Sequence, residues 1–382
     1  MACTVGVDFG TSTTEIAVYQ EGQTRLVRDW DGAAVIPSVV AYLPNGTLEF
    51  GKAAKKRMGV DPQNTLHSVK RIIGLPWKAE EVQTFRSHGR FEMVEGAHGV
   101  PCFVTRAGKV NATEVAGALL QHMRSYPVFE AVSPEKIALT VPAAFSQRQR
   151  NQLVVSATKA GFADVTVIEE PYAAALPFVT QEGKERIVAV YDLGGGTFDF
   201  ALLKLHGAVH WVLASGGEQF LGGSDIDLRL AEWMADETLK VYRRDMRTDS
   251  AIFHRLLLAA EDAKIALSSV LQIEVDLGAI DPSLAGRHLA LTRHKLEQLC
   301  QDLVLRTFVS CDEVLAKAKV KPAEVNEVVL VGGSARMPAV LRALKEYFGR
   351  EPLALDEPDQ AVATGAAMAA AVLAGDRQVL RK

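Results

Sequence analysis

The fold is decided by the stretch Tyr191-Asp192-Leu193-Gly194-Gly195-Gly196-Thr197-Phe198-Asp199. It follows the apolar run 187–190 and leads into the apolar run 200–203. Short apolar runs bounded by turn residues predict buried strands, so we expect the glycines to form the turn of a hairpin. Glycine lets the backbone of such a turn adopt a positive φ and approach a ligand with no Cβ in the way.

A turn of this kind points several backbone N–H groups at one spot, where they form a nest for phosphate oxygens. Asp192 ends the incoming strand and is therefore placed to hold a hydrated Mg²⁺ beside a polyphosphate. A Gly-rich turn beside an aspartate is also typical of an ordinary tight hairpin. This stretch alone leaves both interpretations open.

The same plan occurs near the N-terminus, where residues 5–18 read Val-Gly-Val-Asp-Phe-Gly-Thr-Ser-Thr-Thr-Glu-Ile-Ala-Val. A strand, turn and helix are predicted both at 137–160 and at 328–338. An acidic residue precedes an Ala-rich helix both at 168–176 and at 355–374. We interpret the chain as one α/β unit duplicated, with a small insert in each copy, closing on one nucleotide.

The composition favours a cytoplasmic globular protein. The 382 residues are 48% hydrophobic and 23% charged, which suffices for a large core and two domains. The net charge of −4 gives neither a nucleic-acid nor a membrane-surface footprint. No apolar stretch approaches the roughly 18 residues of a spanning helix, and no leader precedes the first strand. We expect a monomer with no nucleic-acid or membrane partner.

Cysteine and histidine give no metal or disulfide pattern. His206 and His210 lie in a predicted strand and turn, where a spacing of four residues forms no binding face. No pair of cysteines has CxxC spacing. We expect reduced, partly buried thiols at Cys3, Cys102, Cys300 and Cys311.

Several charged positions have two interpretations, one as functional residues and one as ordinary surface or helix-end residues. Lys70 lies in a Lys-Arg pair before an apolar triplet, which is typical of a solvated helix end. Glu170 precedes an Ala-rich helix, where an acidic side chain often only interacts with the helix N-terminus. Glu261, Lys264 and Ser268 share one face of a long helix, as surface ion pairs also do. Their roles depend on whether a cleft lies beside them.

At this point the residues resemble a known family. Over nearly its whole length, the chain is similar to the nucleotide-binding domain of the heat shock protein 70 (DnaK-type) chaperones. The motifs that carry the resemblance are DFGTST (8–13), VKRIIG (69–74), EEPYAAA (169–175), DLGGGTFD (192–199), FLGGSD (220–225), EDAKIALSS (261–269) and VGGSARMP (331–338). The resemblance implies an α/β, actin-like ATPase fold: duplicated ribonuclease-H-like lobes flanking a nucleotide cleft, each with a small inserted subdomain.

The resemblance also implies domain boundaries. We expect lobe I at 1–182, with its core at 1–37 and 113–182 and its insert at 38–112. We expect lobe II at 183–382, with its core at 183–225 and 300–382 and its insert at 226–299. A peptide-binding β-sandwich and a helical lid follow in that family. The sequence ends at Lys382 without them, so we expect the peptide-binding domain to be absent.

The resemblance assigns roles at the phosphates. Mg²⁺, with K⁺ as a further candidate cation, would be held through waters by Asp8 and Asp192. The phosphates of ATP or ADP would be cradled by Gly10, Thr11, Ser12, Thr13, Gly194, Gly195, Gly196, Thr197, Gly222 and Gly223. Lys70 would neutralise charge at the γ-phosphate, and Glu170 would orient or deprotonate the attacking water. Thr197 and Asp199 would assist nearby.

At the nucleoside, the resemblance implies contacts from two segments. Ribose and adenine would be reached by Glu261, Lys264 and Ser268, with Ile265 giving an apolar contact to adenine. The opposite side would be covered by Gly332, Gly333, Ser334 and Arg336, and Asp359 would close the site. Positioning and charge stabilisation supply most of the rate in phosphoryl transfer, so this arrangement suits ATP hydrolysis.

A co-chaperone or nucleotide-exchange partner follows from the same resemblance. Pro142 and Arg150 match the residues that pass the nucleotide state to the surface in that family. The surface that receives J-domain partners departs from the family pattern. The departures are Thr166 for a basic residue, Glu169 for an asparagine, Ala144 for a tyrosine and Gln147 for an aspartate. We expect an atypical J-domain surface.

The preferred hypothesis is Mg-ATP binding with slow hydrolysis, as the nucleotide switch of a chaperone of this type. One alternative is an ATP/ADP-binding interaction module that does not hydrolyse, because the partner surface is altered and the peptide-binding domain is missing. Another is a small-molecule kinase of the same superfamily. Such kinases place a carboxylate base beside a substrate pocket, whereas Lys70 and Glu170 resemble a water-attack arrangement.

Overall fold

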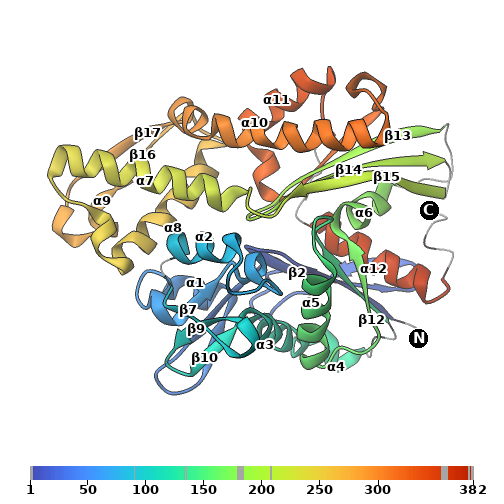
Figure 1. Cartoon of the computed structure of the whole chain (residues 1–382), viewed down its shortest axis with the longest axis horizontal. Coiled ribbons are helices and arrows are strands. Elements are labelled where there is room, and N and C mark those ends of the chain that lie inside the picture. The colour runs from blue at the N-terminus through green and yellow to red at the C-terminus, as the bar shows by residue number, and fades with distance from the viewer. Residues whose placement is uncertain are drawn as a thin grey trace.

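The computed structural model describes residues 3–89, 91–132, 134, 136–178, 185–206, 209–353, 360–376 and 379. Two of its sheets face each other across helices, and the remaining strands lie in segments that project from these sheets (Figure 1). No helix in the described part of the chain is long and apolar enough to cross a membrane.

The N-terminal sheet has the strand order β12-β11-β1-β2-β3, with β4 paired to β2. Its strands are β1 (Thr4–Phe9), β2 (Thr13–Gln20), β3 (Gln23–Leu26), β4 (Ile36–Pro37), β11 (Lys136–Val141) and β12 (Val165–Glu169). Strands β1 and β2 form the predicted antiparallel hairpin, while β1 pairs with β11 in parallel. The tight turn between β1 and β2 confirms the first predicted hairpin.

The C-terminal sheet has the strand order β15-β14-β13-β18. Its strands are β13 (Arg186–Leu193), β14 (Phe198–His206), β15 (Val209–Glu218) and β18 (Glu327–Val331). The pairing repeats that of the N-terminal sheet, because β13 and β14 are antiparallel and β13 pairs with β18 in parallel. Each sheet therefore places one Gly-rich turn at the end of a central hairpin.

Two consecutive glycines lie inside a strand. Gly216 and Gly217 belong to β15 and pair with Phe200 and Asp199 of β14. A Cβ on Gly217 would lie 2.1 Å from the Phe198 carbonyl oxygen. Close strand approach, and not a turn, explains this glycine.

Helices cover the outer faces of both sheets. Beside the N-terminal sheet lie α3 (Ala112–Arg124), α4 (Val128–Ala131) and α5 (Gln147–Lys159). Above the C-terminal sheet lie α10 (Arg293–Ala318), a 3-10 turn η7 (Pro322–Glu324) and α11 (Pro338–Phe348) (Figure 1). Helices α3 and α5 both begin with a capping box, at Asn111 and Ser146. The asparagine and serine side chains satisfy N–H groups that the first helical turn leaves open.

Two Ala-rich helices, α6 (Glu170–Ala175) and α12 (Ala361–Leu373), lie between the sheets (Figure 1). A 3-10 turn, η4 (Leu176–Phe178), continues α6. One face of α12 buries Ala366 and Ala370 against the C-terminal sheet and α6. The other buries Ala363 and Ala367 against β2. Small side chains let the helix fit between two layers.

Gly365 is the closest contact between these helices. A Cβ at this position would lie 1.7 Å from the Ala173 carbonyl oxygen of α6, and backbone cannot move aside cheaply. We expect Gly365→Ala to lower the free energy of unfolding by about 3 kcal/mol, as overpacking of a core does. The neighbouring Thr364→Ala is the control, because Thr364 is only partly buried. Thermal denaturation measures both, and equal melting temperatures would contradict this packing.

The segment 38–112 projects from the N-terminal sheet. It contains β5 (Val39–Tyr42), β6 (Leu48–Phe50), α1 (Gly51–Arg57), η1 (Pro62–Asn64), β7 (Thr65–His67), η2 (Val69–Ile72), α2 (Glu80–Gly89), β8 (Met93–Glu95), η3 (Ala97–Gly99), β9 (Pro101–Thr105) and β10 (Gly108–Asn111). Helix α2 ends at Gly89, and the strands β8, β9 and β10 follow it.

The segment 223–292 projects from the C-terminal sheet and faces the segment 38–112 (Figure 1). It contains α7 (Gly223–Tyr242), η5 (Met246–Thr248), α8 (Ser250–Leu267), β16 (Gln272–Asp276), α9 (Leu277–Ile280), η6 (Pro282–Leu284) and β17 (His288–Thr292). The last 3-10 turn, η8 (Gly333–Arg336), follows β18. All four cysteines are free and buried, as expected for reduced thiols.

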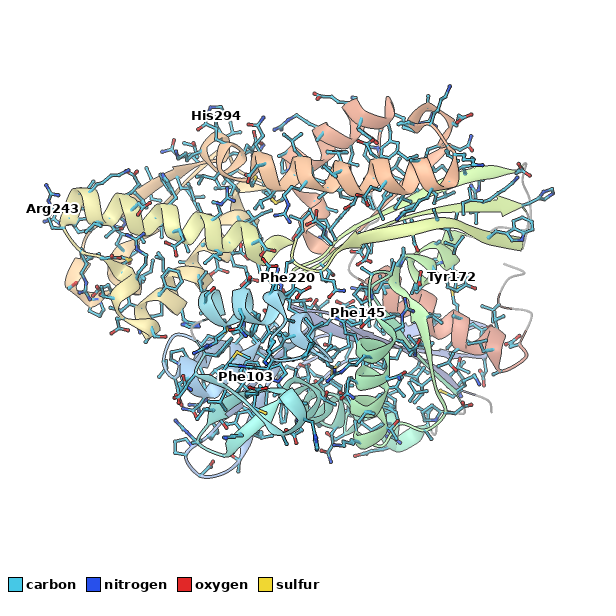
Figure 2. The ribbon with its side chains drawn as sticks, in the orientation of Figure 1. Phe103, Phe145, Tyr172, Phe220, Arg243 and His294 are labelled. Atoms are coloured by element: carbon cyan, nitrogen blue, oxygen red, sulfur yellow. The ribbon has the colours of Figure 1, made fainter. Side chains whose placement is uncertain are left out.

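Aromatic side chains mark the cores of these parts (Figure 2). Phe103 is fully buried in the segment 38–112, and Phe145 is buried beside α5. Both belong to the same hydrophobic cluster as the inward-facing residues of β1 and β11. The segment 38–112 thus shares one hydrophobic core with the N-terminal sheet, and this core fixes the position of the segment.

Candidate functional site

The two Gly-rich turns meet face to face. A Cβ on Gly195 would lie 2.0 Å from Ser12 Oγ, and a Cβ on Gly196 would lie 2.2 Å from Thr11 Cγ2. None of the glycines at 194–196 has a positive φ, so that part of the sequence prediction is wrong. Glycine is required here because a second chain segment approaches the turn, which leaves no space for a side chain.

A cavity of about 70 Å³ lies between the turns. It is lined by many of the predicted residues: Asp8, Gly10, Thr11, Ser12, Thr13, Lys70, Glu170, Asp192, Gly194, Gly195, Thr197, Gly332 and Gly333. These residues come from β1, β2, η2, α6, β13 and the turn after β18. The structure therefore brings together residues that are far apart in the sequence.

Carboxylates crowd this cavity around a single lysine. Burial, together with the neighbouring carboxylates of Glu170, Asp199 and Asp8, raises the pKa of Asp192 well above its ordinary value. Burial and Glu170 likewise raise the pKa of Asp199. Such an excess of negative charge calls for a cation. Among the described residues no three His, Cys, Asp or Glu side chains converge on one point as a set of metal ligands.

Lys70 and Glu170 form a buried ion pair. Lys70 Nζ lies 2.6 Å from Glu170 Oε1, and the two side chains are 2% and 6% exposed. Burial raises the pKa of Glu170 to about 7, against the opposing effect of Lys70 and with a further contribution from Asp8. Burial disfavours the charge on Lys70, but Glu170 and Asp8 outweigh it and raise the pKa of the ammonium group. Lys70 is therefore a fixed positive charge beside the phosphate-sized cavity.

Local backbone geometry aims these two side chains. Ser68, just before η2, has a left-handed backbone with a φ of 56°, which turns the chain inward at Lys70. Glu170 is the first residue of α6 and follows β12 directly. The interpretation of Lys70 as a solvated helix end is wrong, because this side chain is fully enclosed.

Two other carboxylates at the turns are held by backbone and hydroxyl donors. Thr140 Oγ1 donates a hydrogen bond to Asp8 Oδ1 at 2.8 Å. Asp199 Oδ1 accepts a hydrogen bond from the Ala143 N–H at 2.8 Å, which ties β14 to the chain after β11. Asp199 is 2% exposed and does not line the cavity. It lies directly opposite Asp192 in the β13–β14 pairing.

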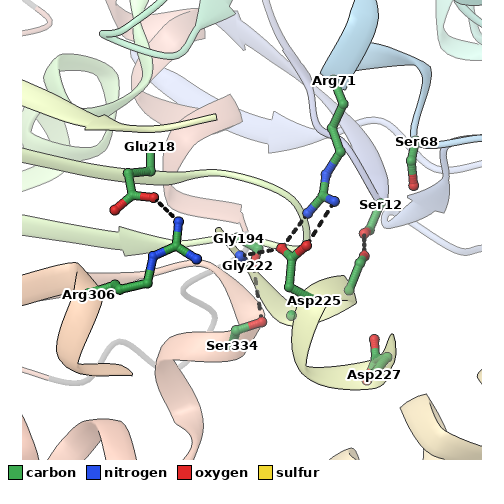
Figure 3. Close-up of polar contacts among 12 residues, drawn as sticks. Ser12, Ser68, Arg71, Gly194, Glu218, Gly222, Asp225, Asp227, Arg306 and Ser334 are labelled. Carbon is green, nitrogen blue, oxygen red and sulfur yellow. Dashed lines mark hydrogen bonds and ion pairs between the residues drawn. The ribbon is translucent and has the colours of Figure 1, made fainter. Parts of the chain in front are cut away.

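Three further predicted residues, Gly222, Gly223 and Ser334, pack against the turn at 194–197 or donate a hydrogen bond to it. Ser334 Oγ donates a hydrogen bond to the Gly194 carbonyl oxygen at 3.1 Å. A Cβ on Gly222 would lie 2.6 Å from the Gly196 nitrogen, and a Cβ on Gly223 would lie 2.4 Å from Ser334 Oγ. Figure 3 shows Gly194, Gly222 and Ser334 together around the turn. Gly222, Gly223 and Ser334 therefore shape the turn without lining the cavity.

The residues of α8 that were predicted to contact the nucleoside differ in their contacts and exposure. Lys264 Nζ lies 2.8 Å from Asp227 Oδ1 and 3.2 Å from the Gly223 carbonyl oxygen. Glu261 pairs with Lys55 of α1 at 2.6 Å. Ile265 is 59% exposed, which leaves an apolar surface open. Ser268 Oγ donates to the Lys264 carbonyl oxygen at 3.3 Å, at the end of the helix.

On the opposite side, Gly332 has a φ of 80°, so this position requires glycine. Its missing Cβ would lie 2.4 Å from the Leu193 carbonyl oxygen. Gly333 and Arg336 are exposed in η8. Asp359 lies outside the described residues. The structure thus brings most of the predicted phosphate-side residues to the cavity, and it shows Ile265, Ser268 and Arg336 lining neither this cavity nor the larger cavity beside it.

Sequence reasoning missed three charged residues of this region. Arg71, considered part of a solvated pair, donates to Asp225 at 3.0 and 2.5 Å (Figure 3). Asp225 also accepts from the Gly222 N–H at 2.8 Å. Glu15 is 2% exposed and lines the cavity. Glu15 was recognisable from the sequence as a candidate site residue, because it is a charged residue inside the apolar run of β2. Nothing local indicates that Arg71 and Asp225 meet.

The chain matches the family model described as Hsp70 protein over residues 4–381. It belongs to the Hsp70 family. Membership in this family supports ATP binding and a chaperone ATPase type of function.

The site fits the nucleotide and divalent metal that the Hsp70 family binds. The acidic cavity would attract a cation, and the facing glycine turns leave a space that side chains would fill. Thr11 Oγ1 is buried with no partner among the described residues, so a hydroxyl donor or acceptor is still available. An oxygen-rich, metal-bound ligand satisfies each of these features.

Proposed function

We propose that the chain binds Mg-ATP in the cleft between its sheets and hydrolyses it slowly to ADP and phosphate. The observation that carries this proposal is the buried Lys70–Glu170 pair between two glycine turns, beside an excess of carboxylates. We propose that two lobes, residues 1–182 and 183–382, carry out this activity.

In this proposal each buried group has one role. A Mg²⁺ ion held through water by Asp8 and Asp192 would compensate phosphate charge. Lys70 stabilises negative charge as it develops on the transferred phosphoryl group. Glu170 accepts a proton from the attacking water, and a pKa near 7 suits that task at neutral pH. The Gly194–Thr197 turn presents backbone N–H groups to the phosphates.

Closure of the cleft is part of the same proposal. Lys55 of α1 and Glu261 of α8 join the two projecting segments through their 2.6 Å ion pair. Arg71 and Asp225 form a second bridge deeper in the cleft. We propose that these bridges hold the nucleotide between the lobes and that their opening permits release.

Lys55→Ala is therefore expected to speed nucleotide release. Both side chains are about one-third exposed, so solvent screening limits the effect to about two- to fivefold. The matched control is Lys52→Ala, an exposed lysine of the same helix. Displacement of a fluorescent ADP analogue in stopped flow measures the rate. Equal release rates for the two variants would show that this bridge does not restrain the nucleotide.

The test of the function is phosphate release from ATP at stoichiometric protein, with Mg²⁺ and with EDTA. Slow release that requires Mg²⁺ supports the proposal. Transfer of phosphate to an added hydroxyl acceptor in place of water would favour the kinase alternative.

A second candidate function is nucleotide binding without turnover. It is favoured by the Lys70–Glu170 ion pair, because Glu170 is then occupied by Lys70 and not free to accept a proton. In this form the nucleotide would only set the lobe arrangement that a partner protein reads. Tight binding of ATP with no phosphate released over hours would support this candidate.

The surface proposed for a co-chaperone has its own arrangement here. Arg150 donates to Glu169 at 2.9 Å and to the Ala143 and Phe145 carbonyl oxygens. Ser215 of β15 also donates to Glu169, at 3.3 Å. Arg150 thus connects the chain after β11 with the strand that leads to Glu170. We propose that a partner with an atypical J-domain contact would be sensed through this connection.

A further inference from the structure

Glu15 is a buried carboxylate to which the proposed function gives no role. It lies inside β2, between the fully buried residues Thr14 and Ile16, and is itself only 2% exposed. A glutamate is almost never enclosed to this degree unless its surroundings compensate its charge. The position of Glu15 in the fold therefore needs an explanation of its own.

The pairing of β1 with β2 places Glu15 beside the phosphate-sized cavity. Glu15 is directly opposite Asp8 in this antiparallel pair, so the two side chains lie on the same face of the sheet. Both residues line the cavity of about 70 Å³. Asp8 is proposed above to hold Mg²⁺ through water. Glu15 thus adds a second carboxylate on the face of the sheet that carries Asp8.

Helix α12 covers this face of β2, with its N-terminal end nearest to Glu15. Ala17 and Tyr19, which share the face of Glu15 because side chains alternate along a strand, belong to the cluster that packs against α12. The Tyr19 hydroxyl donates to Asp376, just beyond the C-terminal end of the helix, at 3.3 Å. Val362, at the opposite end of the helix, lines the cavity together with Glu15.

The N-terminal end of α12 is a source of partial positive charge near this carboxylate. Within the described part of the chain, its N-cap Gln360 makes no side-chain capping hydrogen bond, and its first turn contains no acidic residue. The first N–H groups of a helix favour a negative charge nearby. This end of α12 therefore stabilises a carboxylate at Glu15 and explains how the fold tolerates one there.

Carboxylates outnumber cationic groups around the cavity. Asp8, Glu15, Glu170 and Asp192 all line it, and Lys70 is the one cationic side chain among its described lining residues. Lys70 is already paired with Glu170 at 2.6 Å. A polyphosphate brings further negative charge into this space. The balance of charge therefore favours a ligand that arrives with its own cation.

Glu15 acts on such a ligand through its charge and not through contact, because its side chain is almost completely enclosed. Charges in an enclosed site interact over several ångströms more strongly than charges in water, since solvent screens them less. A carboxylate at this position attracts a cation to the cavity and repels an uncompensated phosphate.

We propose that Glu15 sets the cation requirement of the site: its charge strengthens the binding of a divalent cation and weakens the binding of metal-free nucleotide. This inference rests on the proposed binding of Mg-ATP and identifies the residue that makes the cation obligatory. Glu15 is neither a proton acceptor nor a direct ligand in this account. It selects the metal complex of the nucleotide over the nucleotide alone.

The first test uses the ligand-free protein and Mn²⁺, whose binding is followed directly by electron paramagnetic resonance. Glu15→Gln keeps the shape of the side chain and removes its charge, so we expect it to lower Mn²⁺ affinity at least fivefold. Glu21→Gln, at an exposed position just after the same strand, is the control and should match the wild type. Equal affinities of the wild type and Glu15→Gln, or no Mn²⁺ binding by either, would overturn the proposal.

The second test measures ATP binding by calorimetry in Mg²⁺ and in EDTA. We expect Glu15→Gln to bind metal-free ATP at least tenfold more tightly than the wild type does, while its affinity for Mg-ATP changes less than threefold. A residue that served packing alone would change both affinities together. An unchanged ratio of the two affinities would therefore overturn the proposal.

A charge-retaining variant separates charge from packing. We expect Glu15→Asp to keep Mn²⁺ affinity within twofold of the wild type, and a loss as large as that of Glu15→Gln would assign Glu15 to packing. Glu15→Ala is the second neutral variant if circular dichroism shows that Glu15→Gln fails to fold. None of these readouts depends on hydrolysis. A protein that shows the expected affinities but releases no phosphate would contradict the proposed ATPase activity and support the role of Glu15.

Discussion

Lys70→Ala is expected to lower single-turnover ATP hydrolysis by about 10²- to 10³-fold while leaving nucleotide affinity within a few-fold. Removal of one preorganised group that stabilises transition-state charge has effects of this size. Lys70 Nζ is the one ammonium group of the described chain that lines the phosphate-sized cavity. Quenched-flow measurement of phosphate release gives the rate, and Lys240→Ala, at an exposed position, is the control.

Stability must be separated from chemistry in this experiment. Loss of Lys70 leaves Glu170 buried without its partner, which costs up to about 3–5 kcal/mol for a buried pair. The double variant Lys70→Ala/Glu170→Gln removes both charges, so it should recover most of the lost stability and none of the hydrolysis. Hydrolysis within twofold of the wild type in Lys70→Ala would show that Lys70 has no role in the reaction.

Asp192→Asn is expected to stabilise the protein without ligand and to abolish Mg²⁺-dependent binding of ATP. Burial and the carboxylates of Glu170, Asp199 and Asp8 raise the pKa of Asp192, so its ionised form destabilises the folded state. Asparagine removes that cost, so we expect the ligand-free variant to melt at a higher temperature than the wild type at pH 7. Asp31→Asn, at an exposed position, is the control.

The pH dependence of Asp192→Asn follows from the same shift. A carboxyl with a raised folded pKa binds more protons in the folded than in the unfolded state, so wild-type stability falls as pH rises from its unfolded pKa of about 4. The variant should lose less stability over that rise. Thermal denaturation from pH 5 to 8, with and without Mg-ATP, measures both effects. A lower melting temperature together with retained Mg²⁺-dependent ATP binding would contradict the assigned role of Asp192.

Local patterns sufficed to predict the hairpins and their aspartates. The apolar runs around Gly194–Gly196 and around Gly10 each produce two strands and a tight turn, because that preference is encoded within about 20 residues. The placement of Glu170 after β12 was likewise readable from a strand followed by an Ala-rich helix. These elements carry most of the phosphate side of the candidate site.

Contacts between distant segments were not predictable in the same way. Arg71 and Asp225 are 154 residues apart in the sequence, and only folding brings them together. The role of Gly195 and Gly196 follows from Ser12 and Thr11 of the other turn, so a preference for positive φ was the wrong reason for those glycines. Asp199 accepts a hydrogen bond from the Ala143 N–H, a contact with a distant segment that the local sequence does not indicate.

The central claim is that Lys70, Glu170, Asp8 and Asp192 form a Mg²⁺-dependent ATPase site. The most direct measurement is release of phosphate from radiolabelled ATP by an equimolar amount of protein, in Mg²⁺ and in EDTA, with Lys70→Ala in parallel. The account predicts slow, single-exponential release that is lost in EDTA and in the variant. Release that is equal in Mg²⁺ and EDTA, or equal in wild type and variant, would contradict it.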